Sequence, residues 1–281
     1  MPAFALSEER LAALADLVRD EAAFEQAYPR VADYLSMARQ LAGTGDPVAD
    51  AAFDLRLLHF MTGGASANPY WDLVAPSVSA GPPERGGRRE VNGGRAKGSA
   101  RLGYAQIVVQ ATYAYAVPAP ETLAWIGDIT QGRSVAEIGA GRGYWARQLA
   151  ESGVRITAFD THPPDRTNNT SFPAATGQPH IWHPIHELRD ANAYRDVADP
   201  ADVLLLCWPP GWENPMASGA LAAYQRAGGD LLIYIGEPPG GRTADTAFFE
   251  TLDANWQLLD QDPDYVAWWN LSDIAQCWRR R

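Results

Sequence analysis

The sequence predicts an α/β fold in which a mostly parallel sheet follows a helical amino-terminal region. From about residue 135 onward, short apolar runs alternate with segments of helical spacing, the pattern of repeated β-α-β units. The first of these units contains a glycine-rich turn between its strand and its helix. The first hundred residues instead show helical spacing, followed by a stretch rich in glycine, proline and charge.

The glycine-rich turn joins an apolar run to an amphipathic segment from Tyr144 to about Ser152. Gly139, Gly141 and Gly143 alternate along it, which lets the chain turn sharply and lets a ligand approach the backbone. The start of the following helix offers free N–H groups and a positive dipole end to an anion. A second apolar run ends in Asp160, about twenty residues after the first glycine, where a carboxylate can hold ribose hydroxyls. The unit therefore predicts a nucleoside-binding crevice at the carboxyl ends of parallel strands.

The glycine spacing narrows the class of ligand. A dinucleotide fingerprint, G-x-G-x-x-G, would place its third glycine at Tyr144, whereas here the third glycine is Gly143. Glu137 lies two residues before the first glycine, and the resulting E-x-G-x-G-x-G string resembles the first motif of class I S-adenosylmethionine (SAM) dependent methyltransferases. The resemblance covers residues 134–160 well and the later alternation loosely. A dinucleotide site and a purely structural turn are the alternatives.

This resemblance implies both a fold and a cofactor. The fold is the Rossmann-like class I methyltransferase sheet, mostly parallel with an antiparallel carboxyl-terminal strand, and the cofactor is SAM. In that family the glycine loop, here Gly139, Gly141 and Gly143 behind Glu137, carries the methionine end of SAM. The acid that ends the second strand, here Asp160, holds the ribose.

The amino-terminal region is predicted to contain three helices. Ser7 can cap the first, and the second runs from Val31 to Leu41. Asp46 followed by Pro47 opens a third helix that continues through Phe60.

Composition divides the chain into a helical region (1–77), a loop rich in glycine and arginine (78–100) and a SAM-binding domain (101–281). A solvated flexible segment is the favoured interpretation of the loop, ahead of an anion-binding lid. The helical region is either a lid over the acceptor site or a packing appendage, and both interpretations stay open.

Beyond Asp160 the alternation of apolar strands and helices continues. The predicted elements are strands at 180–185, 202–207 and 230–236, helices at 216–224 and 248–254, an antiparallel pair at 257–260 and 265–269, and a final edge strand at 275–279.

The strand that ends at Cys207 leads into Trp208-Pro-Pro-Gly-Trp212. This stretch resembles the (D/N)-P-P-(Y/F/W) motif of amino-methylating enzymes, in which the Asp or Asn accepts from the target amine. Here Trp208 occupies that position, so the amine-accepting group is missing and methylation of a nucleobase or glutamine amine is disfavoured. Its indole either holds a sulfonium by cation–π attraction or fills the crevice.

Two further places supply candidate catalytic or binding groups. Glu237 follows a buried strand. It either binds a substrate ammonium or takes a proton, or it caps the next turn or pairs with an arginine. Tyr113 and Tyr115 precede the first strand of the sheet and share a face if the segment is extended. We expect Tyr115 to contact SAM, and Tyr113, Trp208 and Glu237 to border the reacting end, with a buried aromatic pair as the alternative for the tyrosines.

A metal site is not expected. His180 and His183 face opposite ways in an extended segment, and Pro184 disfavours a helix that would align His183 with His186. A histidine from this stretch is still a candidate base beside the crevice.

Charge and composition exclude several classes of partner. The net charge of −11 disfavours nucleic acid, which requires a basic surface. The absence of any long apolar run disfavours a membrane span, and the amino terminus lacks the pattern of a secretory signal, so we expect a cytoplasmic enzyme. Cys207 and Cys277 do not form a disulfide framework.

The sequence therefore predicts a transferase that moves the methyl group of SAM to a small-molecule acceptor. The first alternative is a SAM-consuming cyclase of the same fold, of the azetidine-2-carboxylate or cyclopropane amino acid synthase type, which releases methylthioadenosine. The second is a non-catalytic SAM-binding regulator. The oligomeric state is left open.

Overall fold

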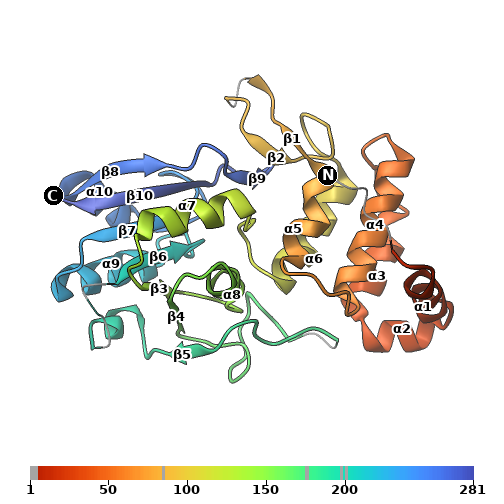
Figure 1. Ribbon diagram of the computed structural model, residues 1–281, viewed down its shortest axis with the longest axis horizontal. Coiled ribbons are helices and arrows are strands. Elements are labelled where there is room, and N and C mark those ends of the chain that lie inside the picture. The colour runs from red at the N-terminus through yellow and green to blue at the C-terminus, as the bar shows by residue number, and fades with distance from the viewer. Residues whose placement is uncertain (1–5, 84–85, 175–176, 197–198, 200–201) are drawn as a thin grey trace.

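The computed structural model describes residues 6–83, 86–174, 177–196, 199 and 202–281, and a helical region stands beside an α/β region in it (Figure 1). None of the helices within these residues is long and apolar enough to span a membrane. The helical region contains α1 (Glu8–Arg19), α2 (Glu21–Ala27), α3 (Pro29–Ala38), α4 (Pro47–Met61), α5 (Pro69–Val74), the 3-10 turn η1 (Ala75–Ser77) and α6 (Ala100–Thr112).

Capping side chains fix where these helices begin. The Ser7 hydroxyl accepts from the Arg10 N–H at 3.2 Å, and the Asp46 carboxylate accepts from the N–H groups of Val48 and Ala49. The first and third predicted helices are thereby confirmed. The second begins at Pro29 rather than two residues later, because proline suits the first helical position.

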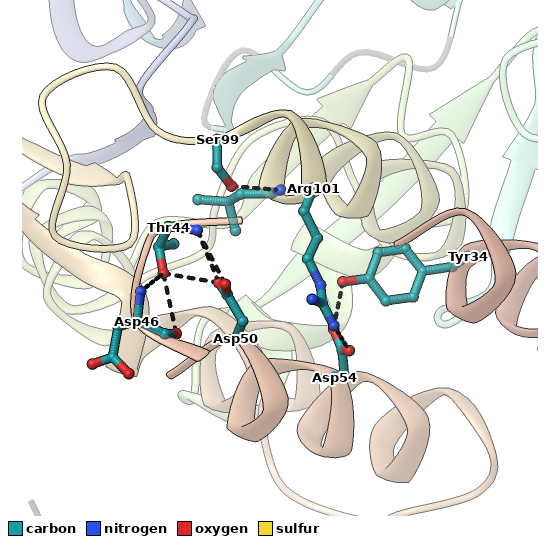
Figure 2. Close-up of polar contacts among 8 residues, drawn as sticks. Tyr34, Thr44, Asp46, Asp50, Asp54, Ser99 and Arg101 are labelled. Carbon is teal, nitrogen blue, oxygen red and sulfur yellow. Dashed lines mark hydrogen bonds and ion pairs between the residues drawn. The ribbon is translucent and has the colours of Figure 1, made fainter. Parts of the chain in front are cut away.

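Polar contacts join α3, α4 and α6 (Figure 2). The Arg101 guanidinium of α6 pairs with Asp54 of α4, and the Tyr34 hydroxyl of α3 donates to the same carboxylate at 2.8 Å. Burial, and then the charge of Asp54, raise the pKa of Tyr34, so the phenol stays protonated and keeps donating. Ser99 accepts from the Leu102 N–H and so caps α6. The contacts of Arg101 and Tyr34 hold α6 against α3 and α4.

Among the described residues, the main sheet has seven strands in the order β5-β4-β3-β6-β7-β10-β8. Strand β10 is antiparallel to both of its neighbours, and the pairs from β5 to β7 are parallel. The predicted α/β fold, mostly parallel with an antiparallel carboxyl-terminal strand, is confirmed. The strands are β3 (Val135–Ile138), β4 (Ile156–Asp160), β5 (Ile185–Glu187), β6 (Val203–Cys207), β7 (Leu231–Gly236), β8 (Trp256–Gln261) and β10 (Ile274–Arg280).

Helices cover both faces of this sheet, which is why its central strands are continuously apolar. On one face α7 (Pro120–Thr130) and α8 (Tyr144–Glu151) pack through residues such as Ile126 and Trp145. On the other face lie the 3-10 helix η3 (Ala191–Asp196), α9 (Met216–Ala227) and α10 (Thr246–Asn255), which pack through residues such as Phe248.

The carboxyl-terminal strands differ from the predicted pairing. Strand β9 (Val266–Trp268) does not pair with β8 but joins a separate sheet, parallel to β2 (Arg89–Val91), which in turn pairs with β1 (Val78–Ala80). Strand β10 is not at the edge, because it inserts between β7 and β8. The third strand also lies later than predicted, since β5 begins at Ile185. Sequence periodicity reports burial but not the pairing partner, which is why these assignments failed.

The expected loop at 78–100 contains the hairpin strands β1 and β2, while residues 84–85, including one of its arginines, lie outside the described residues. Arg89 of β2 contacts Glu121 at 3.2 Å, and Arg88 contacts Glu90 at 3.0 Å. These arginines therefore serve contacts within the protein.

Buried hydrogen bonds join the helical region to the α/β region. The Tyr144 hydroxyl, at the start of α8, donates to Asn68 Oδ1 at 3.0 Å and accepts from the Tyr70 N–H at 3.1 Å. The Trp268 indole of β9 donates to the Tyr70 hydroxyl at 2.9 Å. Loss of one partner would leave another buried polar group unsatisfied, so the two regions stabilise each other.

We predict that Tyr144→Phe lowers the free energy of unfolding by about 1–3 kcal/mol, because the buried Tyr70 N–H loses its acceptor and Asn68 Oδ1 keeps only the Trp71 N–H as a donor. Tyr194→Phe is the matched control, since the buried Tyr194 hydroxyl has no hydrogen-bond partner among the described residues. That change should be neutral or stabilising. Urea unfolding measures both variants, and an equal loss in the two would contradict the prediction.

Candidate functional site

A cavity of about 800 Å³ lies at the carboxyl ends of the central parallel strands. Its walls come from the glycine loop after β3, the end of β4, the loop after β6, and one side of α6. Such a position is where open α/β sheets bind ligands, and the volume falls in the range of small-molecule sites. Of the predicted site residues, Tyr115, Glu137, Gly139, Gly141, Asp160 and Trp208 line the cavity.

The glycine loop requires residues without a side chain. Gly139, Gly141 and Gly143 have φ values of 79°, 56° and 71°, a region that other residues rarely adopt. A Cβ atom on Gly139 would lie 2.1 Å from the Met216 side chain, and one on Gly141 would lie 2.3 Å from the Phe172 ring. Gly143 is the N-cap of α8 and is not among the lining residues; a Cβ atom on it would lie 3.1 Å from the Cβ atom of His183. The loop therefore leaves its backbone close to the cavity.

Asp160 ties the ends of β3 and β4 together. Its Oδ2 accepts from the Gly141 N–H and its Oδ1 from the His162 N–H, both at 2.8 Å. An ionised carboxylate has about four acceptor positions, so two are left for hydroxyl groups of a ligand. The acid at the end of the second strand can thus hold the loop and a ligand together.

Glu137 is a buried acid at the base of the same cavity. Burial, and next the charge of Asp160, raise the pKa of Glu137 to about 8. Its Oε2 atom has no hydrogen-bond partner among the described residues. A protonated carboxyl with an unused oxygen can donate to a ligand or accept from one.

Three aromatic side chains, Tyr115, Phe172 and Trp208, form one wall of the cavity. The Tyr115 ring stacks on Trp208 at 5.4 Å between centroids and meets the edge of Phe172 at 5.6 Å. Trp208 has a φ of 53°, an unusual conformation for a residue with a side chain. Its indole donates to Asp273 Oδ2 at 3.2 Å, which holds the ring against Tyr115.

Asp273 and Phe172 were not predicted. Asp273 is buried immediately before β10, and burial raises its pKa to about 6 while the hydroxyl of Tyr265 and the indole of Trp208 donate to it. An acid just before an apolar strand was the available signal for Asp273. Phe172 lies in the long connection from β4 to β5, which has no periodic pattern.

Tyr113 lies apart from Tyr115, because α6 ends at Thr112 and the segment is not extended. The Tyr113 ring is buried among Tyr70, Tyr144 and Trp182 and is not among the described residues that line the cavity. The aromatic-packing alternative fits this position, and the predicted catalytic role of Tyr113 gains no contact in support.

Glu237 holds two loops rather than facing the cavity. Its Oε1 accepts from the Ser272 N–H at 2.9 Å and its Oε2 from the Arg242 N–H at 2.6 Å. The capping alternative fits these contacts, and Glu237 is not among the described lining residues. Its predicted contact with the reacting groups is left without support, so it takes no part in the function proposed below.

His183 and His186 have different packing partners. The His186 ring packs against Phe159, and His183 lies beside Gly143. In the part of the chain that the structure describes, no group of three or more potential metal ligands is close enough to hold an ion.

Arg142, within the glycine loop, organises the segment that covers the cavity. Its buried guanidinium donates to the carbonyl groups of Ala111, Pro173, Pro179 and His180, at 2.8 to 3.0 Å. Burial, and then the charge of Arg30, lower the pKa of Arg142 to about 10, so it stays charged at neutral pH. One side chain thus joins the end of α6 to the connection that carries Phe172.

Comparisons with known proteins give structural matches alone. No family model matches, and no curated protein matches. Solved structures that match include magnesium protoporphyrin IX methyltransferase from Synechocystis PCC 6803 with bound S-adenosylhomocysteine (13% identity, TM-score 0.40, 64% of this chain and 88% of that chain). Human N-acetylserotonin methyltransferase in complex with SAM also matches (14%, 0.35, 96% and 66%), as does the mitomycin 7-O-methyltransferase MmcR (16%, 0.35, 99% and 77%). These are class I SAM-dependent methyltransferases, and at such identities the matches say nothing of the reaction.

We predict that Glu137→Gln stabilises the protein increasingly as pH rises. Because the folded pKa of about 8 exceeds the ordinary value of 4.5, the native protein keeps a proton that the unfolded chain loses. The stability of the unaltered protein therefore falls between these pH values, and the variant escapes that loss. Each pKa unit between 4.5 and about 8 corresponds to about 1.4 kcal/mol. Above pH 8 the variant should therefore be more stable than the unaltered protein by more than that amount.

Urea unfolding at pH 5, 7 and 9 measures this effect. Glu250→Gln, on the exposed surface of α10, is the matched control and should show no such pH dependence. A constant difference between Glu137→Gln and the unaltered protein across the three pH values would contradict the assignment of a raised pKa.

Proposed function

We propose that the protein transfers the methyl group of SAM to a small-molecule acceptor. The observation that carries this proposal is the extent of the cavity, which continues from the glycine loop and Asp160 to the side of α6. The lining along α6, which includes Gln106, Ile107 and Gln110, lies outside the residues assigned to SAM. The additional space beside the glycine loop favours a second reactant over cyclisation of SAM by itself.

The residues at the glycine loop fit SAM. Gly139 and Gly141 keep their backbone open to the methionine portion, and the unused acceptor positions of Asp160 suit the ribose hydroxyls. The unpartnered Oε2 of Glu137 suits a polar group of the methionine portion. Bound SAM supplies an electrophilic methyl group on a positively charged sulfur.

The protein's own side chains position the reactants and surround the sulfonium. The stacked rings of Tyr115 and Trp208 present π faces that attract a sulfonium without reacting with it. Asp273 fixes the indole, so this wall does not have to reorganise during the reaction. The site can hold the acceptor, the methyl carbon and the sulfur in line. Such positioning can lower the activation free energy by ~7 kcal/mol or more.

Asp160→Ala should weaken SAM binding by about 1–3 kcal/mol, because charge-assisted hydrogen bonds to the ribose are lost and the Gly141 N–H loses its acceptor. Titration calorimetry gives the affinity. Asp128→Ala, on the exposed side of α7, is the control and should bind SAM normally. Unchanged SAM affinity in Asp160→Ala would remove the basis of the proposal, and binding of NAD instead would favour the dinucleotide alternative.

The sulfur product separates the candidate reactions. We expect S-adenosylhomocysteine when SAM is incubated with an acceptor, because the S–CH₃ bond breaks. Chromatography of a reaction with SAM alone should show no methylthioadenosine above the spontaneous background. Rapid enzyme-dependent methylthioadenosine would instead identify a cyclase, and SAM binding without any product across a panel of phenols, amines and acids would identify a regulator.

A further inference from the structure

A second cavity, of about 220 Å³, lies in the helical region and shares no lining residue with the large one. Its walls include parts of α3, α4, η1 and the start of α6, and Figure 2 shows the polar contacts around it. Pockets for drug-sized ligands measure about 300–1,000 Å³, so this cavity suits a smaller compound. Its charged lining residues are Asp50, Asp54, Arg56 and Arg101.

Arg56 brings a buried cation to this small cavity. It is 6% exposed, and the hydrogen bond that the structure gives its guanidinium runs from Nε to the Leu73 carbonyl at 3.0 Å. A guanidinium has several N–H donors, and this bond uses one of them. None of the ion pairs among the described residues includes Arg56. Burial lowers the pKa of Arg56, but a guanidinium stays charged at neutral pH. A buried cation without a paired anion is unfavourable, so the cavity favours an anion beside Arg56.

Arg101 adds a second donor, while the acids of the cavity already have donors within the protein. The Nε atom of Arg101 is buried and has no hydrogen-bond partner among the described residues. Its Nη2 atom pairs with Asp54, which also accepts from the Tyr34 hydroxyl at 2.8 Å. Asp50 accepts from both the N–H and the hydroxyl of Thr44, at 2.9 to 3.1 Å (Figure 2). An acceptor is therefore what these side chains would gain from a ligand.

The charges of the lining residues set the kind of anion. Two arginines and two acids line the cavity, so their formal charges cancel. A doubly charged anion such as phosphate would be repelled by both acids, whereas a carboxylate adds a single charge. A carboxylate also matches the planar fork of a guanidinium with parallel hydrogen bonds. The other lining residues include an apolar set that suits a hydrocarbon chain: Ala49, Ala52, Phe53, Pro76 and Leu102.

From this arrangement we infer that the small cavity binds a monocarboxylate with a short apolar chain. The carboxylate accepts from the guanidinium groups of Arg56 and Arg101, and the chain lies against Phe53 and Leu102. This site is separate from the cavity that contains the glycine loop, so the inference does not rest on the function proposed above.

The test measures binding of 4-methylpentanoate to the full chain by ligand-detected NMR titration, which reports weak affinities. Two comparison compounds separate the parts of the ligand: 4-methylpentan-1-ol has the chain without the charge, and inorganic phosphate has the charge without the chain. The carboxylate should bind at least about tenfold more tightly than either. Saturating S-adenosylhomocysteine should not displace it, because the two cavities share no lining residue.

Ala52→Glu is the variant that tests the position of the site. Ala52 is an exposed residue of α4 that lines the small cavity, so the fold will tolerate glutamate while the added negative charge repels a carboxylate. Binding should weaken at least about tenfold. Ala51→Glu is the matched control, since Ala51 is exposed on the same helix and does not line the cavity. Arg101→Lys keeps a positive charge for Asp54 but removes the Nε donor, and it should also weaken binding.

Several outcomes would overturn the inference. It is wrong if 4-methylpentanoate does not bind, or if the alcohol or phosphate binds as tightly. It is also wrong if Ala52→Glu and Ala51→Glu bind the carboxylate equally well. Displacement by S-adenosylhomocysteine would assign the carboxylate to the large cavity and would equally contradict the inference. None of these results depends on whether the protein transfers a methyl group.

Discussion

Arg142 makes the contacts on which the shape of the cavity depends. Its buried guanidinium is surrounded by carbonyl groups from the end of α6 and from the β4–β5 connection. A buried charge is tolerated when hydrogen bonds replace its hydration, and here four carbonyl acceptors do so. Because Arg142 lies between Gly141 and Gly143, the same residue that continues the glycine loop also holds the segment that carries Phe172. The loop, the covering segment and α6 are therefore positioned together.

The aromatic wall shows how an unfavourable conformation is held in place. Trp208 adopts a positive φ, which for a large side chain is of order 1–3 kcal/mol unfavourable. Its N–H donates to the Ile235 carbonyl, its indole donates to Asp273, and its ring stacks on Tyr115. These contacts offset the strain and leave the indole one orientation. Asp273 also accepts from Tyr265, so the wall is anchored in the core behind the sheet.

The parts that sequence reasoning predicted are those set by local patterns. Asp160 and the glycine loop belong to one β-α-β unit, whose turn and strand end follow from neighbouring residues. The surroundings of Tyr113 and Glu237 depend on long-range contacts that the sequence does not show. Tyr113 turns into the helical core because α6 ends one residue earlier, and the backbone groups that Glu237 accepts from include the distant Ser272 N–H. The place of Gln106 in the cavity wall had no sequence signal, since a glutamine in an apolar helix does not reveal what it faces.

Helix α6 connects the two regions in a way that bears on the role of the helical region. Its apolar residues, including Leu102 and Val109, are buried in the core of the helical region, and Arg101 is paired there. Gln106 and Ile107 on the same helix line the cavity. Since α6 is one continuous helix, a shift of the helical core against the sheet would also move the cavity wall that Gln106 and Ile107 form. The hydrogen bond from Arg142 to the Ala111 carbonyl would pass such a shift to the glycine loop. The buried hydrogen bonds of Tyr144 and Tyr70 oppose such a shift. Helix α6 thus supplies one wall of the cavity and is packed against the helices that precede it.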